Sequence, residues 1–103
     1  MKQDDLIVIG GGAAGLTAAG LAAREGLKVR VLETRERPAR KILVTGKGRC
    51  NLTNNCSPED FLKNVRQNPK FLTSAIWGFP PSATMELFES LGVPLKTERG
   101  NRV

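Results

Sequence analysis

The sequence contains no histidine and no tyrosine, and it has only two cysteines and one tryptophan among 103 residues. Without histidine, these residues cannot supply a histidine-ligated metal site or a histidine-based catalytic triad. The two cysteines, Cys50 and Cys56, are too few for a disulfide framework. No signal sequence is recognisable, so we expect a cytoplasmic protein with reduced thiols, and we identify no metal site.

Acidic residues are scarce between positions 34 and 49, where six cations are opposed by Glu36 alone and the net charge of the chain is +6. Such a cluster can attract phosphate, nucleic acid or an anionic surface, or it can be a solvated basic face. Nucleic acid is disfavoured as a partner because the aromatic residues do not interleave with these cations. The cations are Arg35, Arg37, Arg40, Lys41, Lys47 and Arg49.

The longest uncharged stretch covers residues 6–23, LIVIGGGAAGLTAAGLAA, and is rich in glycine and alanine. It follows Asp4 and Asp5, where a signal peptide would carry positive charge. We therefore expect soluble core rather than a membrane segment, and no membrane partner. The length, with 40% apolar and 25% charged residues, suits one small globular domain.

The first third of the sequence predicts a βαβ unit. Residues 6–9 are a short apolar run that ends in glycines, as in a buried parallel strand. Residues 14–25 favour a helix that ends at Gly26, and residues 28–33 favour a second strand. We therefore predict an α/β, Rossmann-like unit followed by a long loop and helices, with a parallel sheet that is incomplete in this chain.

Residues 10–15, GGGAAG, satisfy G-x-G-x-x-G between the predicted strand and helix. Gly10 would permit the tight turn, Gly12 would let a pyrophosphate approach the backbone, and Gly15 would let the helix lie close to the strand. Glu33 stands 18 residues after Gly15, where it could accept hydrogen bonds from an adenosine ribose and disfavour NADP. We predict a dinucleotide site rather than an empty glycine turn, but the pattern does not separate FAD from NAD.

A second loop rich in glycine and cations, VTGKGRCNLTNN, covers residues 44–55. Its glycines could bring backbone close to a ligand, its cations could neutralise phosphate, and Asn51, Thr53 and Asn54 could address the polar edge of a flavin. The spacing alone is equally compatible with a surface loop whose Gly and Asn residues make turns. The segment is also similar to the redox-active disulfide of the pyridine-nucleotide disulfide reductases, which place fewer residues between their cysteines than the five that separate Cys50 from Cys56.

Residues 40–54, RKILVTGKGRCNLTN, resemble the hallmark loop of a bacterial flavoprotein family that includes aminoacetone-oxidase-like proteins and flavin-dependent bile-acid reductases. The glycine fingerprint, Glu33 and the segment LFESLGVPLKTERGNRV at 87–103 extend the resemblance in order. An N-terminal fingerprint of this kind is similar to the FAD-binding half of the two-dinucleotide-binding-domain flavoproteins. The resemblance implies bound FAD, residues 1–103 as the N-terminal part of an FAD-binding domain, and an inserted substrate domain beyond residue 103.

The resemblance also assigns the cofactor contacts. It places the pyrophosphate on the first glycine loop, the ribose at Glu33 and the rest of the cofactor along the second loop. The candidate cofactor-binding residues are Gly10, Gly12, Ala13, Ala14, Gly15, Glu33, Thr34, Arg40, Lys41, Thr45, Gly46, Gly48, Arg49, Cys50 and Asn51.

Beyond residue 57 the sequence predicts helices over 59–67 and 70–77, and a third that Ser82 caps and Gly92 ends. Ser57 and Pro58 are typical of a helix start. Residues 41–45 are predicted as a short extended piece, and residues 99–101 as a hairpin turn.

The expected function is the FAD-binding portion of a flavin-dependent oxidoreductase that acts on a small organic substrate, with NAD(P)H or oxygen as a redox partner. Two alternatives stay open: a disulfide-reductase-like enzyme that uses Cys50 and Cys56, and a non-enzymatic NAD-binding module. No catalytic acid or base is identified, because Glu86 and Glu89 are typical of helix surface.

Overall fold

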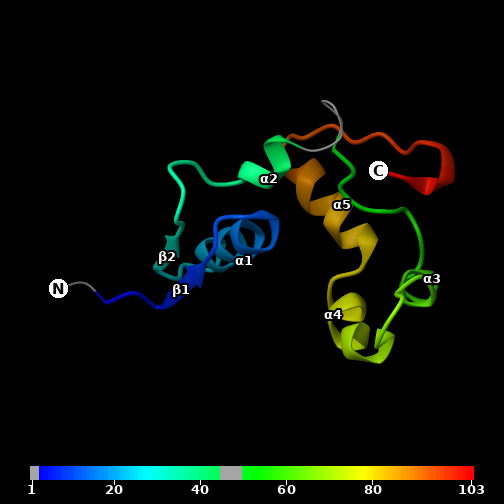
Figure 1. Ribbon diagram of the computed structural model, residues 1–103, viewed down its shortest axis with the longest axis horizontal. Coiled ribbons are helices and arrows are strands. Elements are labelled where there is room, and N and C mark those ends of the chain that lie inside the picture. Colours follow the sequence, from blue (N-terminus) through cyan, green and yellow to red (C-terminus); the bar gives the residue numbers. More distant parts are fainter. Residues whose placement is uncertain (1–2, 45–49) are drawn as a thin grey trace. The chain divides into compact units, whose positions relative to one another are not determined.

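The computed structural model describes residues 3–44 and 50–103. Its chain divides into two compact units, Met1–Cys50 and Asn51–Val103 (Figure 1). Each unit is described by itself.

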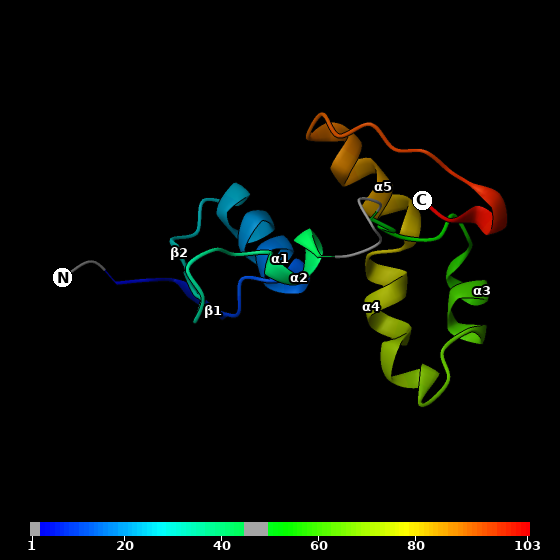
Figure 2. The ribbon, with the colours of Figure 1, turned by 45° about the horizontal axis from the view of Figure 1, so that its top comes forward.

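The first unit is a βαβ unit, as the sequence predicts. Strand β1 (Leu6–Ile9) pairs in parallel with β2 (Val29–Leu32), and helix α1 (Ala13–Arg24) connects them (Figure 2). The register places Val8 opposite Val31. The α/β Rossmann-like class is therefore confirmed, with two strands of a parallel sheet among the described residues.

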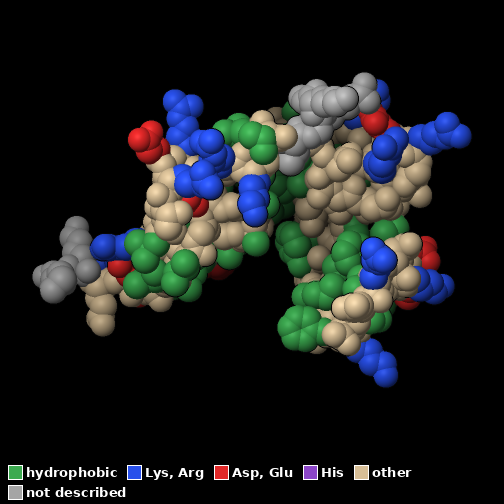
Figure 3. Space-filling view, viewed as in Figure 1, with side chains coloured by type: hydrophobic (Ala, Val, Ile, Leu, Met, Phe, Trp, Pro, Cys, Tyr) green, Lys and Arg blue, Asp and Glu red, His purple; other side chains and the backbone are tan. Residues whose placement is uncertain are grey.

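The two faces of this small sheet differ. Along both strands, half-buried and exposed residues alternate, because successive side chains point to opposite faces. Ile7, Ile9 and Leu32 lie on the exposed side and are 54%, 85% and 49% exposed, and Figure 3 shows hydrophobic side chains at the surface of this unit. The core is consequently thin, and Ala19 on α1 is one of its buried residues.

The ends of α1 follow its local sequence. The helix begins at Ala13, directly after the glycine run, and Gly12 is its N-cap. It ends before Gly26, whose φ of +88° is a left-handed conformation that glycine adopts without strain. The Gly26 N–H donates to the carbonyl of Ala23 at 3.0 Å. The predicted helix end is confirmed.

The connection after β2 contains a short helix that the sequence did not predict. Residues 41–45 were expected to be extended, but α2 spans Arg40–Leu43. This expectation was wrong for the described part because Ala39 adopts φ +60°, which turns the chain into a helical segment. The apolar pattern of residues 42–44 does not encode that turn.

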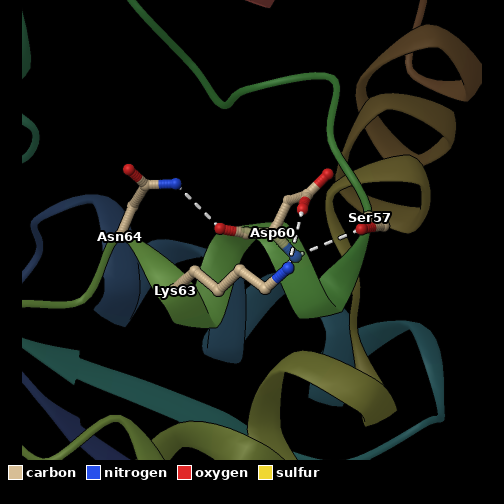
Figure 4. Close-up of polar contacts among 4 residues, drawn as sticks. All are labelled: Ser57, Asp60, Lys63 and Asn64. Atoms are coloured by element: carbon tan, nitrogen blue, oxygen red, sulfur yellow. Dashed lines mark hydrogen bonds and ion pairs between the residues drawn. The ribbon is translucent and has the colours of Figure 1, made fainter.

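The second unit contains three short helical segments that follow one another in the chain, and Figure 1 shows them near one another. Helix α3 (Pro58–Lys63) packs against the 3₁₀ helix η2 (Pro69–Leu72) and against α4 (Thr73–Gly78). The hydroxyl of Ser57 caps α3 by accepting from the Asp60 N–H at 3.1 Å (Figure 4). The predicted capping residue is confirmed, whereas α3 ends earlier than expected.

The last α-helix, α5, spans Pro81–Ser90. The prediction that Ser82 caps it was wrong, because Pro80 holds the N-cap position and no side chain caps the helix. Proline fits the first turn of a helix since its missing N–H needs no partner there. Gly92 follows the C-terminus with φ +85°, as predicted.

The chain then makes a turn that pairs with the end of the second loop. The 3₁₀ helix η3 (Arg99–Asn101) lies between Glu98 and Arg102, which form an antiparallel bridge. This bridge confirms the predicted turn. Arg102 also bridges Asn54, so residues 52–55 and 98–103 form one paired structure, which we call the loop anchor. Val103, 8% exposed, lies at its buried end.

Candidate functional site

The turn between β1 and α1 has the geometry that the glycine pattern predicts. Gly10 adopts φ +100°, a conformation that L-residues with side chains rarely take. Its N–H donates to the carbonyl of Leu32 at 2.8 Å, which ties the turn to the end of β2. The glycine loop therefore lies at the carboxyl edge of both strands, where parallel α/β sheets bind ligands.

Gly15 permits the close approach of α1 to the turn. A Cβ atom at this position would overlap the carbonyl oxygen of Gly10 and would lie 3.2 Å from a methyl carbon of Val8. Backbone atoms cannot yield as a flexible side chain can. The predicted packing role of Gly15 is thus confirmed by the geometry, while its contact with a cofactor stays a prediction.

Gly12, in contrast, faces open space. A Cβ atom there would meet nothing within 4 Å, and Gly12, Ala13 and Ala14 are exposed. The Leu16 N–H donates to Gly12 O at 2.9 Å, so the N–H groups that precede Leu16 lack intrahelical acceptors, and no side chain caps them. This end of α1 offers exposed donors and the positive end of the helix dipole, an arrangement that suits a pyrophosphate.

Glu33 is bonded to the glycine loop. One carboxylate oxygen accepts from the Gly11 N–H and the other from the Arg35 N–H, both at 2.9 Å. The Arg35 amide, followed by that of Gly11, holds the pKa of Glu33 below its ordinary value of 4.5, because both bonds favour the ionised form. A carboxylate oxygen has more than one lone pair, so the predicted ribose contact is compatible with these bonds and stays a prediction.

Gly11 is a constituent of the site that the sequence reasoning passed over. It is buried, and its carbonyl accepts from the Ala39 N–H at 2.6 Å. A Cβ atom on Gly11 would lie 3.1 Å from Pro38 Cβ and 3.3 Å from Glu33 Oε1. The sequence did carry a signal for Gly11: the fingerprint needs glycine only at the first and third positions of the run Gly10–Gly12, yet the middle position is also glycine.

Residues 33–39 therefore return to the glycine loop and bring the start of α2 with them. Arg40 and Lys41 directly follow Ala39, whose N–H donates to Gly11 O, and both are exposed. Thr34 is exposed in the same connection. The structure thus brings the glycine loop, Glu33 and the start of α2 together, and the contact of these residues with a cofactor stays a prediction.

The second loop is described only at its end. The candidates Thr45, Gly46, Gly48 and Arg49 lie outside the described residues. Cys50 is exposed and Cys56 is half-buried, and no disulfide joins them. Asn51 opens the second unit and stands next to the loop anchor in the chain.

Grouped metal ligands and membrane-spanning helices are both absent from the described ranges. Within residues 3–44 and 50–103, no three His, Cys, Asp or Glu side chains are grouped as metal ligands would be. None of the helices in the described part is both long and apolar enough to cross a membrane.

The βαβ topology, the glycine turn and the acidic residue at the end of β2 together define a dinucleotide-binding Rossmann domain. Residues 4–103 match the family model described as HI0933-like protein Rossmann domain, and the chain belongs to this family. The family-level resemblance inferred from the sequence is thereby confirmed.

Relatives of known name match most of the chain. It is 38% identical over 94 residues to a ribosomal RNA dihydrouridine synthase of Escherichia coli and 40% identical over 95 residues to a 3-dehydro-bile acid delta(4,6)-reductase of Clostridium scindens, with 90% of the chain covered in each case. A ribosomal RNA dihydrouridine synthase of Haemophilus influenzae is 44% identical over 76 residues, or 73% of the chain. The matched region spans 23%, 23% and 18% of these three relatives.

Proposed function

We propose that this chain is the N-terminal, FAD-binding part of a flavin-dependent oxidoreductase. The observation that carries the proposal is the glycine turn: its exposed helix terminus faces open space at Gly12, while Glu33 is fixed beside it. The relatives named as a reductase and as dihydrouridine synthases support an oxidoreductase.

The space and the charge around the glycine turn are compatible with FAD. The open space at Gly12 leaves room for a pyrophosphate against the backbone, and the exposed Arg40 and Lys41 offer compensating charge nearby. FAD would supply the two-electron redox chemistry. The chain's own residues would bind and orient it: Gly10–Gly15 at the pyrophosphate, Glu33 and Thr34 at the ribose end, and Cys50 and Asn51 further along the cofactor.

The names of the relatives support a reaction class. Both kinds of name describe reduction: dihydrouridine is a reduced uridine, and the second name is that of a reductase. We therefore propose a reductive reaction, with NAD(P)H as the electron source that such a reaction requires. A small organic substrate, an inserted substrate domain, a cytoplasmic location and a likeness to aminoacetone-oxidase-like proteins remain predictions.

Ribosomal RNA is a second candidate substrate, because two of the relatives are named for it. The aromatic residues do not interleave with the basic cluster, which disfavours nucleic acid, and that expectation also remains a prediction. The test uses a strain of the source organism from which the gene for this protein has been deleted. Loss of dihydrouridine from its ribosomal RNA, measured by mass spectrometry of digested nucleosides, would establish RNA, and unchanged dihydrouridine would remove this candidate.

The cofactor is tested first on the complete open reading frame. We expect the purified protein to show a flavin absorption spectrum, and denaturation to release a pigment that chromatography identifies as FAD. A colourless protein that also fails to take up added FAD would refute the proposal. Reversible NAD binding that depends on Glu33 would then favour the NAD-binding module. A redox-active disulfide between Cys50 and Cys56 would instead favour the disulfide-reductase alternative.

A further inference from the structure

The end of the second loop is held by residues about fifty positions away in the sequence. The Leu52 N–H donates to Val103 O at 2.7 Å, and the Val103 N–H donates to Thr53 O at 3.0 Å. The Asn55 N–H donates to Asn101 O at 2.7 Å. These backbone bonds fix both ends of residues 52–55 against the turn.

Asn54 adds a side-chain bond to this loop anchor. Its Nδ2 donates to Gly100 O at 3.0 Å across a separation of 46 residues. The acceptor lies at the tip of the turn, where Gly100 and Asn101 adopt φ +76° and +60°. Asn54 is half-buried, and its backbone bridges Arg102. The amide therefore links residue 54 to the part of the turn whose backbone is left-handed.

We propose that Asn54 is a positioning residue for the cofactor, which acts by holding residues 52–55, and Asn51 next to them in the chain, against the turn before the flavin arrives. Asn51, a candidate flavin contact, is joined directly to Leu52, the first residue that the turn fixes. A loop that is already ordered loses less conformational freedom on binding, so its affinity for a ligand is higher. This inference rests on the proposed flavin-binding function.

The test is Asn54→Ala in the complete open reading frame. Losing one hydrogen bond that orders the loop is expected to raise the dissociation constant for FAD about three- to tenfold. The visible flavin band should also shift, because less ordered residues 52–55 let Asn51, a candidate flavin contact, move relative to the ring. Asn54→Gln keeps the amide donor and should retain more affinity than Asn54→Asp, whose ionised side chain cannot donate.

Asn64 provides a matched control in the same unit. Its Nδ2 donates to Asp60 O at 2.8 Å, so it makes the same kind of amide-to-carbonyl bond at the end of α3 (Figure 4). Neither residue belongs to the loop anchor. Asn64→Ala should leave both the FAD affinity and the flavin spectrum unchanged. An equal loss of affinity in both variants would show a general loss of stability and would overturn the positioning role.

Amide hydrogen exchange at Leu52, Asn55 and Val103 separates this proposal from the function on which it rests. Faster exchange in Asn54→Ala, with weaker FAD binding and a shifted spectrum, supports the positioning role. Faster exchange with wild-type affinity and spectrum overturns it and leaves the flavoprotein proposal intact. Failure of the wild-type protein to bind FAD overturns both, whatever the exchange rates show.

Discussion

Individual backbone atoms decide whether the nucleotide-binding turn can form. Gly10 needs its positive φ, Gly11 fits against Pro38, and Gly15 leaves no room for a methyl group beside the carbonyl of Gly10. Three glycines in one loop thus serve three different physical purposes. Glu33 also acts on this loop, because its carboxylate accepts a hydrogen bond from the Gly11 N–H.

Gly15→Ala is expected to disrupt the first unit, because the new Cβ would overlap the Gly10 carbonyl oxygen and the helix would have to shift. We expect a clear loss of thermal stability and of bound FAD in the complete protein. Gly20→Ala is the matched control: it lies in the same helix, is exposed, and has nothing within 4 Å of the added atom. That change should stabilise the protein by up to about 1 kcal/mol. Equal behaviour of the two variants would contradict the steric explanation.

The carboxylate of Glu33 should make stability depend on pH. Its pKa is lower in the folded state than the ordinary value of 4.5. At pH values between the folded-state pKa and the ordinary one, the unfolded state binds more protons, so stability rises with pH. The contribution is present above the ordinary value of 4.5 and is lost as the pH falls through the folded-state pKa.

Glu33→Gln removes this titration, so its unfolding free energy should fall less than that of the wild type between about pH 6 and pH 3. Denaturant unfolding at each pH gives the comparison. Parallel curves for the two proteins would show that the bonds to Gly11 and Arg35 do not favour the charged form.

At the scale of secondary-structure elements, short helices depend on their ends. Helix α3 has six residues, a length at which isolated helices do not form in water, so its cap and its packing against η2 and α4 stabilise it. Helix α2 has four residues and follows Ala39, whose backbone is in the left-handed region and whose N–H donates to Gly11 O. Such elements form where tertiary contacts select them.

Ser57→Ala should lower stability by about 1 kcal/mol, because the Asp60 N–H loses its acceptor. Ser57→Asp keeps an oxygen acceptor at the N-cap and should retain most of the stability. Chemical denaturation measures both. A loss of similar size for Ser57→Asp would indicate that the cap bond is not the cause.

On the scale of the whole molecule, the two-stranded sheet leaves one apolar face uncovered. Ile7, Ile9 and Leu32 are all about half exposed or more, and the chain spans 23% of the length of two relatives that it matches. In doubly wound folds, helices cover both faces of the sheet.

We therefore expect the isolated 103-residue chain to self-associate through this face as its concentration rises. Ile9→Gln should shift sedimentation velocity profiles toward the monomer, because it places a polar side chain at the most exposed of the three positions. Arg30→Gln, on the same face but without loss of apolar surface, is the control. Equal association of wild type and Ile9→Gln would exclude this face as the cause.

The sequence by itself determined the features that depend on neighbouring residues. These are the βαβ order, the turn at Gly10, the helix ends at Gly26 and Gly92, the Ser57 cap and the turn at Arg99–Asn101. Each follows from a local conformational preference or from a hydrophobic period, and the family hallmark is equally local. The helix at Arg40–Leu43 was missed because its apolar residues also suit an extended segment. The N-cap at Pro80 was missed because Ser82 also suits a helix cap.

Only the tertiary structure decided which groups meet across the chain. The Glu33 bond to Gly11 spans 22 residues and the Asn54 bond to Gly100 spans 46. Neither is a motif, because a backbone N–H or carbonyl is present at almost every position and any of them could be the partner. Packing selects one, and it does so only after the strands, helices and turns have brought distant segments together.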